Sequence, residues 1–339
     1  MRAGKDHFKN EHEEAHIDEK YDEKYTEAKE ESEEAEEQKR IPSFVTYPRM
    51  FITYRWYRPI FTGLLFGVFF IVFAGAVIIG AVMYEGGNIN SALEMLKGGY
   101  DSFDVYTPIG AAVTLGSIAM MIPSLAIANA IAGGRTFRSY ASSRGGWSFG
   151  VFIKSLILAA FFVVIPIAIK LIFMTGRTGT FSFTKEGLII AAILGPMQCI
   201  AEEYVFRGLL LQTLGSWFRF PPIAILLSSA AFTALHPYNT YGMIEVFVTA
   251  MVFGIIAWMS HGIEAGAALH VAYNMTIFFC TGFGFGEVSS HTTQQDLIFE
   301  AAILGVFFIV MLFCKRFGMF EEVKKNDAEI WNSKKKGLA

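Results

Sequence analysis

The sequence predicts an all-α integral membrane protein, a bundle of about eight transmembrane helices. Hydrophobic residues occupy 53% of the 339 positions and charged residues only 17%. The apolar residues gather in eight long runs, several of which exceed the roughly 20 residues that a helix needs to cross a bilayer. Helices are the expected form of such spans because every backbone polar group must be paired inside the hydrocarbon region.

The runs begin after a charged N-terminal segment and continue almost to the C-terminus. Their approximate limits are 60–83, 108–131, 152–174, 188–214, 222–236, 244–259, 263–280 and 297–314. The fifth and sixth runs are nearer fifteen residues, so partial shielding by other helices is expected there. Residues 1–42 are rich in Glu and Lys and have few bulky apolar side chains, which predicts a disordered or loosely helical tail.

The orientation follows from the distribution of Lys and Arg between the loops. On one side lie Lys39, Arg40, Arg49, Arg55, Arg58, Arg135, Arg138, Arg144, Arg219, Lys315 and Arg316, and on the other only Lys97, Arg177 and Lys185. Both termini are therefore predicted to be cytoplasmic, in a multi-pass protein of the cell membrane. Lys154 and Lys170 lie near the ends of the third run, and their ammonium groups are expected to reach the membrane surface.

The fourth run carries charged side chains at a depth where they are costly. The stretch CIAEEYVFRG contains Glu202, Glu203 and Arg207, and a charge at the centre of a membrane helix costs about 2.5–3.5 kcal/mol even on lenient scales. Glu203 precedes Arg207 by four residues, the favourable order for an ion pair within a helix. Glu202 is rotated by about 100° and is predicted to face elsewhere. Pro196 is expected to kink or widen the helix just before the two acids.

Two further runs contain embedded histidines. His236 follows Phe232 by four residues and precedes Pro237, so the fifth helix is predicted to end at His236. His270 and Asn274 are four residues apart and share one face of the seventh helix.

These polar side chains are predicted to lie in one layer of the membrane. Counted at ~1.5 Å per residue from the predicted cytoplasmic ends, Glu202, His236, His270 and Asn274 lie roughly 11–21 Å deep in a ~30 Å core. A carboxylate and a histidine can turn a water held in such a site into a nucleophile, while a second histidine and an amide donate to a developing oxyanion. The alternative is that each residue only holds the bundle together by hydrogen bonds between helices.

Three motifs resemble those of a known family. EEYVFR matches Glu-Glu-x-x-x-Arg, FTALH matches Phe-x-x-x-His, and HVAYN matches His-x-x-x-Asn. In this order on successive membrane helices, they resemble the CAAX protease and bacteriocin-processing family of intramembrane peptidases, which includes type II CAAX prenyl endopeptidases and abortive-infection proteins. The resemblance implies that Glu202 is the general base that activates water, assisted by His236. It also implies that His270 and Asn274 stabilise the oxyanion.

The resemblance assigns Glu203 and Arg207 the task of ordering the site. Members of the family have been described both as metalloproteases and as metal-independent glutamate peptidases. We favour a site that requires no cofactor, because an asparagine suits an oxyanion better than a metal. A zinc ion held by Glu202, His236 and His270 stays open as the alternative.

Composition and the apolar runs, together with a resemblance that covers about residues 188–280, divide the chain into five segments. These are a charged cytoplasmic tail over 1–42, the first three spans over 43–187, the catalytic helices over 188–280, the last span over 281–318 and a basic cytoplasmic tail over 319–339. The predicted function is hydrolysis of a peptide bond in a membrane-associated peptide or protein. The alternatives are a catalytically idle immunity or scaffold protein, and a proton-coupled transporter. The lipid bilayer is an expected partner, and nucleic acid is not.

Overall fold

A computed structural model describes residues 42–90, 103–236, 238–286, 292–320 and 327–337 of the chain. Within these ranges the regular structure is helical, and the only β pairing is in two isolated bridges, Ser142 with Gly262 and Arg177 with Phe285. The predicted all-α class is thereby confirmed for the described part of the chain. The tail predicted over 1–42 lies outside the described residues except for Pro42.

Six stretches of helix in the described residues are long and apolar enough to cross a membrane. They are Arg58–Tyr84, Pro108–Ala132, Phe149–Thr175, Lys185–Phe218, Thr240–Met259 and Gln294–Arg316. The predicted count of eight is not reached, because the fifth and seventh runs form helices of a different character. Helix α11, Pro221–Thr233, has only 13 residues, and α13, Glu264–Gly282, is rich in small and polar residues.

Local sequence signals start most of these helices. Thr184, Asn239 and Thr293 each accept a hydrogen bond from the backbone N–H three residues on, and so cap α9 (Lys185–Glu203), α12 (Thr240–Met259) and α14 (Gln294–Arg316). A side-chain acceptor at this position satisfies an N–H that the first helical turn leaves unpaired. Helix α11 instead begins with Pro221, whose fixed φ suits the first helical position.

Several of the spans change helical form along their length. The second consists of α4 (Pro108–Ala111), η3 (Ala112–Gly116), α5 (Ser117–Ala119) and α6 (Met121–Ala132). The third consists of α7 (Phe149–Ala159), η5 (Ala160–Val164), α8 (Ile165–Ile169) and η6 (Lys170–Thr175). In the fourth, α9 passes into the wider π-helical turns of η7 (Tyr204–Leu211) and then α10 (Gln212–Phe218).

Two predicted details of these helices are wrong by a few residues. The widened segment η7 follows Glu202 and Glu203, whereas Pro196 was expected to widen the helix before them. Helix α11 ends at Thr233 and not at His236. The backbone N–H of His236 bonds to the Thr233 carbonyl in the turn that follows, so His236 lies just beyond the helix end.

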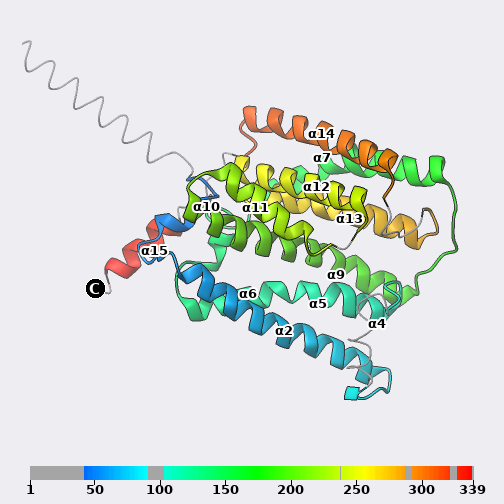
Figure 1. Ribbon diagram of the computed structural model, residues 1–339, viewed down its shortest axis with the longest axis horizontal. Coiled ribbons are helices and arrows are strands. Elements are labelled where there is room, and N and C mark those ends of the chain that lie inside the picture. Colours follow the sequence, from blue (N-terminus) through cyan, green and yellow to red (C-terminus); the bar gives the residue numbers. More distant parts are fainter. Residues whose placement is uncertain (1–41, 91–102, 237, 287–291, 321–326, 338–339) are drawn as a thin grey trace, which may run out of the picture. The chain divides into compact units, whose positions relative to one another are not determined.

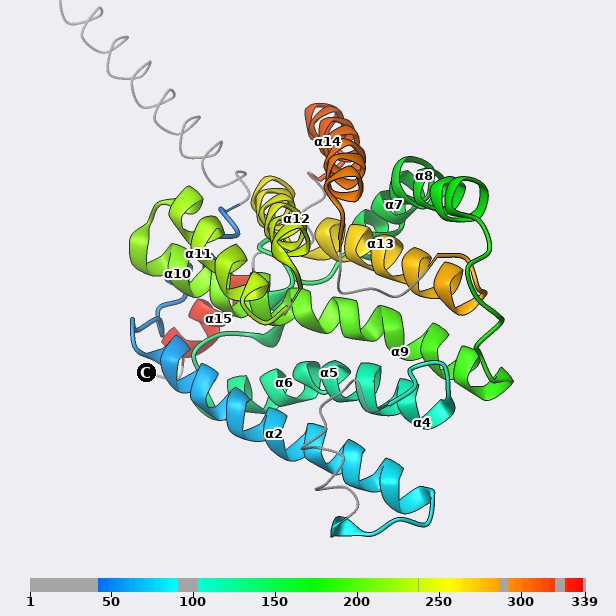
Figure 2. The ribbon, with the colours of Figure 1, turned by 45° about the vertical axis from the view of Figure 1, so that its right-hand side comes forward.

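Helix α13 lies at the centre of the helix packing. It packs against α7, α9 and α12, while α2 (Arg58–Tyr84) packs against α6 at the edge, as Figures 1 and 2 show. All ten residues from Glu264 to Tyr273 are buried. Because neighbouring helices and not lipid cover this half of α13, it can carry Gly, Ala, His and Asn without exposing them to hydrocarbon.

The residues just before α2 and the helix α15, Asp327–Lys336, pack together. Tyr47 and Phe51 form a small apolar cluster with Ala328 and Trp331, and the indole N–H of Trp331 donates to the Thr53 hydroxyl over 3.0 Å. Part of the segment 319–339 is therefore folded onto the same face as the start of α2.

Candidate active site

The six predicted site residues come from four places in the chain. Glu202 and Glu203 end α9, Arg207 lies in η7, and His236 follows α11. His270 and Asn274 lie on α13. Hydrogen bonds and ion-pair contacts among the described side chains connect five of the six, Glu202, Glu203, Arg207, His270 and Asn274.

Glu203 joins α9 to α13. One of its oxygens, Oε1, lies 2.8 Å from Arg207 Nη1 and 3.0 Å from His270 Nδ1. A carboxylate only accepts hydrogen bonds, so Nδ1 of His270 carries the proton in this contact. The predicted Glu203–Arg207 pair is present. The bond from Glu203 to His270, 67 residues away, was not predicted.

Arg207 is only 1% exposed, and its guanidinium group has polar and aromatic contacts besides Glu203. Its Nη2 donates to the Ala250 carbonyl over 3.1 Å. Its guanidinium carbon lies 4.8 Å from the ring centre of Phe232 and 5.1 Å from that of Phe253. Aromatic faces and a carbonyl stabilise a desolvated cation, so Arg207 has partners other than Glu203.

His270 also contacts Asn274 and Glu202. Its Nε2 lies 3.0 Å from Asn274 Nδ2 and 3.5 Å from Glu202 Oε2. With the proton on Nδ1, Nε2 accepts from the Asn274 amide. An NH₂ group has two N–H donors, so the second N–H of Asn274 can donate to another partner, and the Cys199 side chain lies within its reach.

His236 approaches from the side of α11. Its Nδ1 lies 2.9 Å from the Phe232 carbonyl oxygen, and because a carbonyl cannot donate, the proton sits on Nδ1. The Nε2 lone pair of His236 is therefore available to accept a proton. The ring stacks beside that of Phe232 with centres 4.5 Å apart, as the four-residue spacing predicted.

These side chains line one end of a cavity of about 500 Å³. His236, His270, Asn274 and Gln198 belong to its wall. Glu202 is 7% exposed and does not itself line the cavity, but its Oε2 lies 3.5 Å from Nε2 of His270, which does. The cavity therefore reaches a side chain that contacts the Glu202 carboxyl group.

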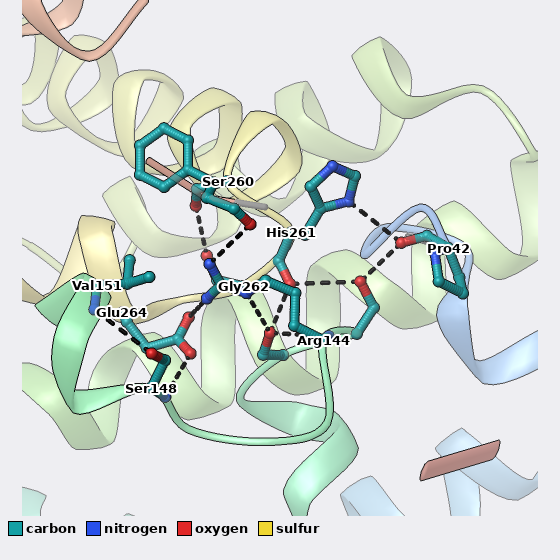
Figure 3. A network of polar contacts seen from close by, with 11 residues as sticks. Pro42, Arg144, Ser148, Val151, Ser260, His261, Gly262 and Glu264 are labelled. Atoms are coloured by element: carbon teal, nitrogen blue, oxygen red, sulfur yellow. Dashed lines mark hydrogen bonds and ion pairs between the residues drawn. The ribbon is translucent and has the colours of Figure 1, made fainter. Parts of the chain in front are cut away.

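The position of α13 is fixed at its first residue by a buried ion pair. Arg144 Nη2 lies 2.8 Å from Glu264 Oε2, and the two side chains are 1% and 0% exposed. The other Glu264 oxygen accepts from the Ser148 backbone N–H over 2.8 Å. Figure 3 shows the Arg144 side chain between Glu264 and the turn that carries Ser260 and Gly262. This network sets where α13 begins, and with it the positions of His270 and Asn274.

Further hydrogen bonds connect the same turn to the start of the described chain. His261 Nδ1 lies 3.2 Å from the Pro42 carbonyl oxygen, and Ser143 donates to that oxygen over 2.7 Å (Figure 3). Burial is the main cause of a lowered pKa at His261. The neutral ring is thus favoured, and the Nδ1–H donates to Pro42.

The donor set of the proposed zinc site does not fit a metal in this arrangement. Among the described residues, no group of three or more His, Cys, Asp or Glu side chains is placed to hold an ion. Both ring nitrogens of His270 are engaged, Nδ1 with Glu203 and Nε2 with Asn274. A ligating histidine needs one free lone pair, so Glu202, His236 and His270 do not form a ready zinc site.

Some residues of this site were missed from the sequence. Gln198 lies one helical turn before Glu202 on the cavity wall, and the Phe253 ring lies 5.1 Å from that of His270. The four-residue spacing of Gln198 from Glu202 is a signal that could have been used. Nothing in the sequence marks Phe253 among its many apolar neighbours.

The comparisons with known proteins address the same helices. Residues 184–276 match the family model of type II CAAX prenyl endopeptidase Rce1-like proteins. This segment is Rce1-like. The match confirms the resemblance predicted from the three motifs, and all six predicted site residues lie within it.

Part of the chain is also similar to a bacterial protein. The chain is 34% identical over 101 residues to the uncharacterized protein YyaK of Bacillus subtilis strain 168, an overlap of 27% of this chain and 33% of YyaK. The chain therefore matches about a third of the length of this curated relative. No solved structure matches.

Proposed function

We propose that the protein is a membrane-embedded endopeptidase that hydrolyses a peptide bond with a water activated by Glu202 and His236. The observation that carries the proposal is the cavity of about 500 Å³, whose wall includes His236, His270 and Asn274, with Oε2 of Glu202 3.5 Å from Nε2 of His270. The Rce1-like match of residues 184–276 supports peptidase chemistry.

In the proposed reaction, a water lies between the Glu202 carboxylate and Nε2 of His236. Glu202 takes a proton from the water as it attacks the scissile carbonyl carbon, and His236 holds the attacking oxygen in place. The second N–H of Asn274 donates to the carbonyl oxygen as negative charge develops on it. As the oxyanion collapses, the scissile C–N bond breaks and the proton on Glu202 passes to the leaving nitrogen, so that Glu202 returns to its starting state.

Glu203 and Arg207 act on the reaction through His270. The Glu203 carboxylate accepts from Nδ1–H of His270 and fixes the orientation of the ring. Nε2 of His270 accepts from the Asn274 amide, so His270 acts on the oxyanion by holding this amide in place. Arg207 lies 2.8 Å from Glu203, and because both side chains are buried, their charges interact strongly.

We propose that the reaction needs no metal. The Asn274 amide, held by Nε2 of His270, suits hydrogen bonding to an oxyanion better than binding a metal. The prediction is that a chelator leaves turnover unchanged, and that added zinc does not restore a Glu202→Gln variant.

The cavity also suggests from which side the substrate arrives. Its wall includes Thr175, Tyr238, Gly286 and Thr292, which lie at the helix ends opposite the arginine-rich loops. If the arginine-rich face is cytoplasmic, as the loop charges predict, the cavity opens toward the outer face. We therefore propose a substrate that reaches the site from the outer half of the membrane.

The test is cleavage of membrane-associated peptides by the purified protein in lipid nanodiscs. Glu202→Gln is expected to abolish cleavage and to leave the unfolding temperature unchanged, because it keeps the side-chain shape. Glu186→Gln is the matched control, since Glu186 is an exposed carboxylate at the other end of α9. Near-normal turnover by Glu202→Gln would exclude Glu202 as the base, and no cleavage of any peptide by the wild type would favour the idle alternative.

A further inference from the structure

The far end of the same cavity carries a second group of charged side chains. Its wall includes Glu245 of α12, Asp296 and Glu300 of α14, and Lys170 of η6. Lys170 Nζ lies 2.8 Å from Asp296 Oδ1 and 3.7 Å from Glu300 Oε1. Lys170 was expected to reach the membrane surface, but it is only 18% exposed and faces these acids.

The hydroxyl of Tyr273 connects this group to α13. It donates to Glu245 Oε1 over 2.6 Å, and Tyr273 is the residue immediately before Asn274 in the sequence. The charged group and the candidate active site are thus parts of one cavity wall.

The charges in this group do not balance. Three carboxylates face one ammonium group, and Lys170 is the only Lys or Arg among the described residues that line the cavity. Lys170 is committed to Asp296 at 2.8 Å, and its ammonium also lies 4.5 Å from the Phe299 ring centre. Glu245 and Glu300 therefore have no full cationic partner in the described part of the chain.

Glu300 is the acid that most clearly lacks a donor. The residue is 6% exposed and lines the cavity, and the Tyr273 hydroxyl lies close to its carboxyl group. That hydroxyl has a single hydrogen and donates it to Glu245, so Oε2 of Glu300 has no hydrogen-bond partner among the described residues. A buried carboxylate oxygen without a donor costs free energy. Such an atom marks a place where a donor from outside the chain would be stabilised.

We propose that Glu245 and Glu300 form a subsite for a basic side chain, Lys or Arg, of the peptide substrate. This inference rests on the proposed function, because it names the substrate of the same cavity. A cationic side chain would supply the missing donor to Glu300 and balance the negative charge. Both acids lie in partly buried positions, where charge-assisted hydrogen bonds are strong.

The structure sets the distance of this subsite from the scissile bond. Glu245 lies eight residues before Phe253 on α12, and the Phe253 ring contacts His270. Eight residues of helix correspond to about 12 Å along its axis. An extended peptide advances by roughly 3.3 Å per residue, so the basic side chain belongs about three or four residues from the cleaved bond.

The experiment uses peptide pairs that differ only by Lys or Gln at one position, scanned up to five residues on either side of the cleaved bond. Binding is measured with fluorescent peptides in the Glu202→Gln background, and kcat/KM with the wild type. Lys is expected to improve both by at least about tenfold at a position three or four residues away, the size of one charge-assisted hydrogen bond. Glu245→Gln and Glu300→Gln should each reduce this preference, and the double variant should abolish it.

The controls separate this inference from the proposed function. Glu186→Gln should keep the full preference for Lys, and unfolding temperatures should show that each variant is folded. If Lys and Gln peptides bind equally to the folded Glu202→Gln protein at every position, the subsite is refuted whatever the turnover. If Lys peptides bind better but the wild type cleaves none, the subsite stands as a binding site and the proposed peptidase function fails.

Discussion

Replacing Glu203 by Gln tests the contacts that connect α9 to α13. The substitution keeps the size of the side chain and an oxygen that accepts from His270 Nδ1, but it removes the charge that faces Arg207 at 2.8 Å. An uncompensated buried charge costs about 3–5 kcal/mol. Arg207 keeps the Ala250 carbonyl and the rings of Phe232 and Phe253, so we expect the lower end, about 3 kcal/mol.

The second half of the test is a double-mutant cycle with Arg207→Met. This single variant leaves the Glu203 carboxyl group buried at 0% exposure without its counter-charge, and it should lose a similar amount of stability. In the double variant neither charge remains, and at least about 2 kcal/mol of the summed loss should return as coupling. Turnover should stay low in all three variants, because Glu203→Gln removes the carboxylate that accepts from His270 and Arg207→Met removes the side chain that holds this carboxylate in place.

The measurement is thermal unfolding in detergent or nanodiscs, with turnover of one peptide followed in parallel. At about 2.1 cal/mol/K per residue, a loss of 3 kcal/mol corresponds to a fall in Tm of roughly 4 °C for a chain of 339 residues. Glu186→Gln, on the exposed start of α9, should shift Tm by less than about 1 °C, corresponding to about 0.5 kcal/mol. If the stability loss of the double variant equals the sum of the two single losses within about 0.5 kcal/mol, the ion-pair reasoning is refuted. Full turnover by the double variant would refute the role given to Glu203.

Three further predictions concern parts of the chain outside the six site residues. Glu264→Gln leaves Arg144 buried without its counter-charge, so it should lower the stability measured by thermal unfolding by about 3–5 kcal/mol. Adding Arg144→Met should recover part of this loss. An unchanged Tm would show that the network in Figure 3 does not anchor α13. Tags at both termini should be accessible only from the cytoplasm and a tag in the 281–296 loop only from outside, and the reverse labelling pattern would overturn the orientation from loop charges. Removal of residues 1–40 should leave insertion and peptide cleavage nearly intact, and loss of cleavage in folded protein would assign the tail a role in substrate binding or regulation.

Several features of the site were readable from spacing alone. Glu203 and Arg207 pair as predicted because a four-residue spacing brings side chains together within one helix. The same reasoning applies to the contact between His270 and Asn274, and to the stacking of Phe232 on His236. These are local relations, and helical geometry fixes them before any tertiary contact forms.

Composition by itself determined that the chain is helical and suited to a membrane, since long apolar runs can pair their backbone groups there only as helices. Motif order determined the Rce1-like likeness of residues 184–276. Tertiary structure alone decided that Glu203 bonds to His270, that Lys170 turns inward to Asp296, and that a polar helix such as α13 lies at the centre. The reason is physical: each of these contacts joins residues far apart in the chain, so it depends on how whole helices pack. The pattern of residues within one helix does not indicate which other helix will pack against it.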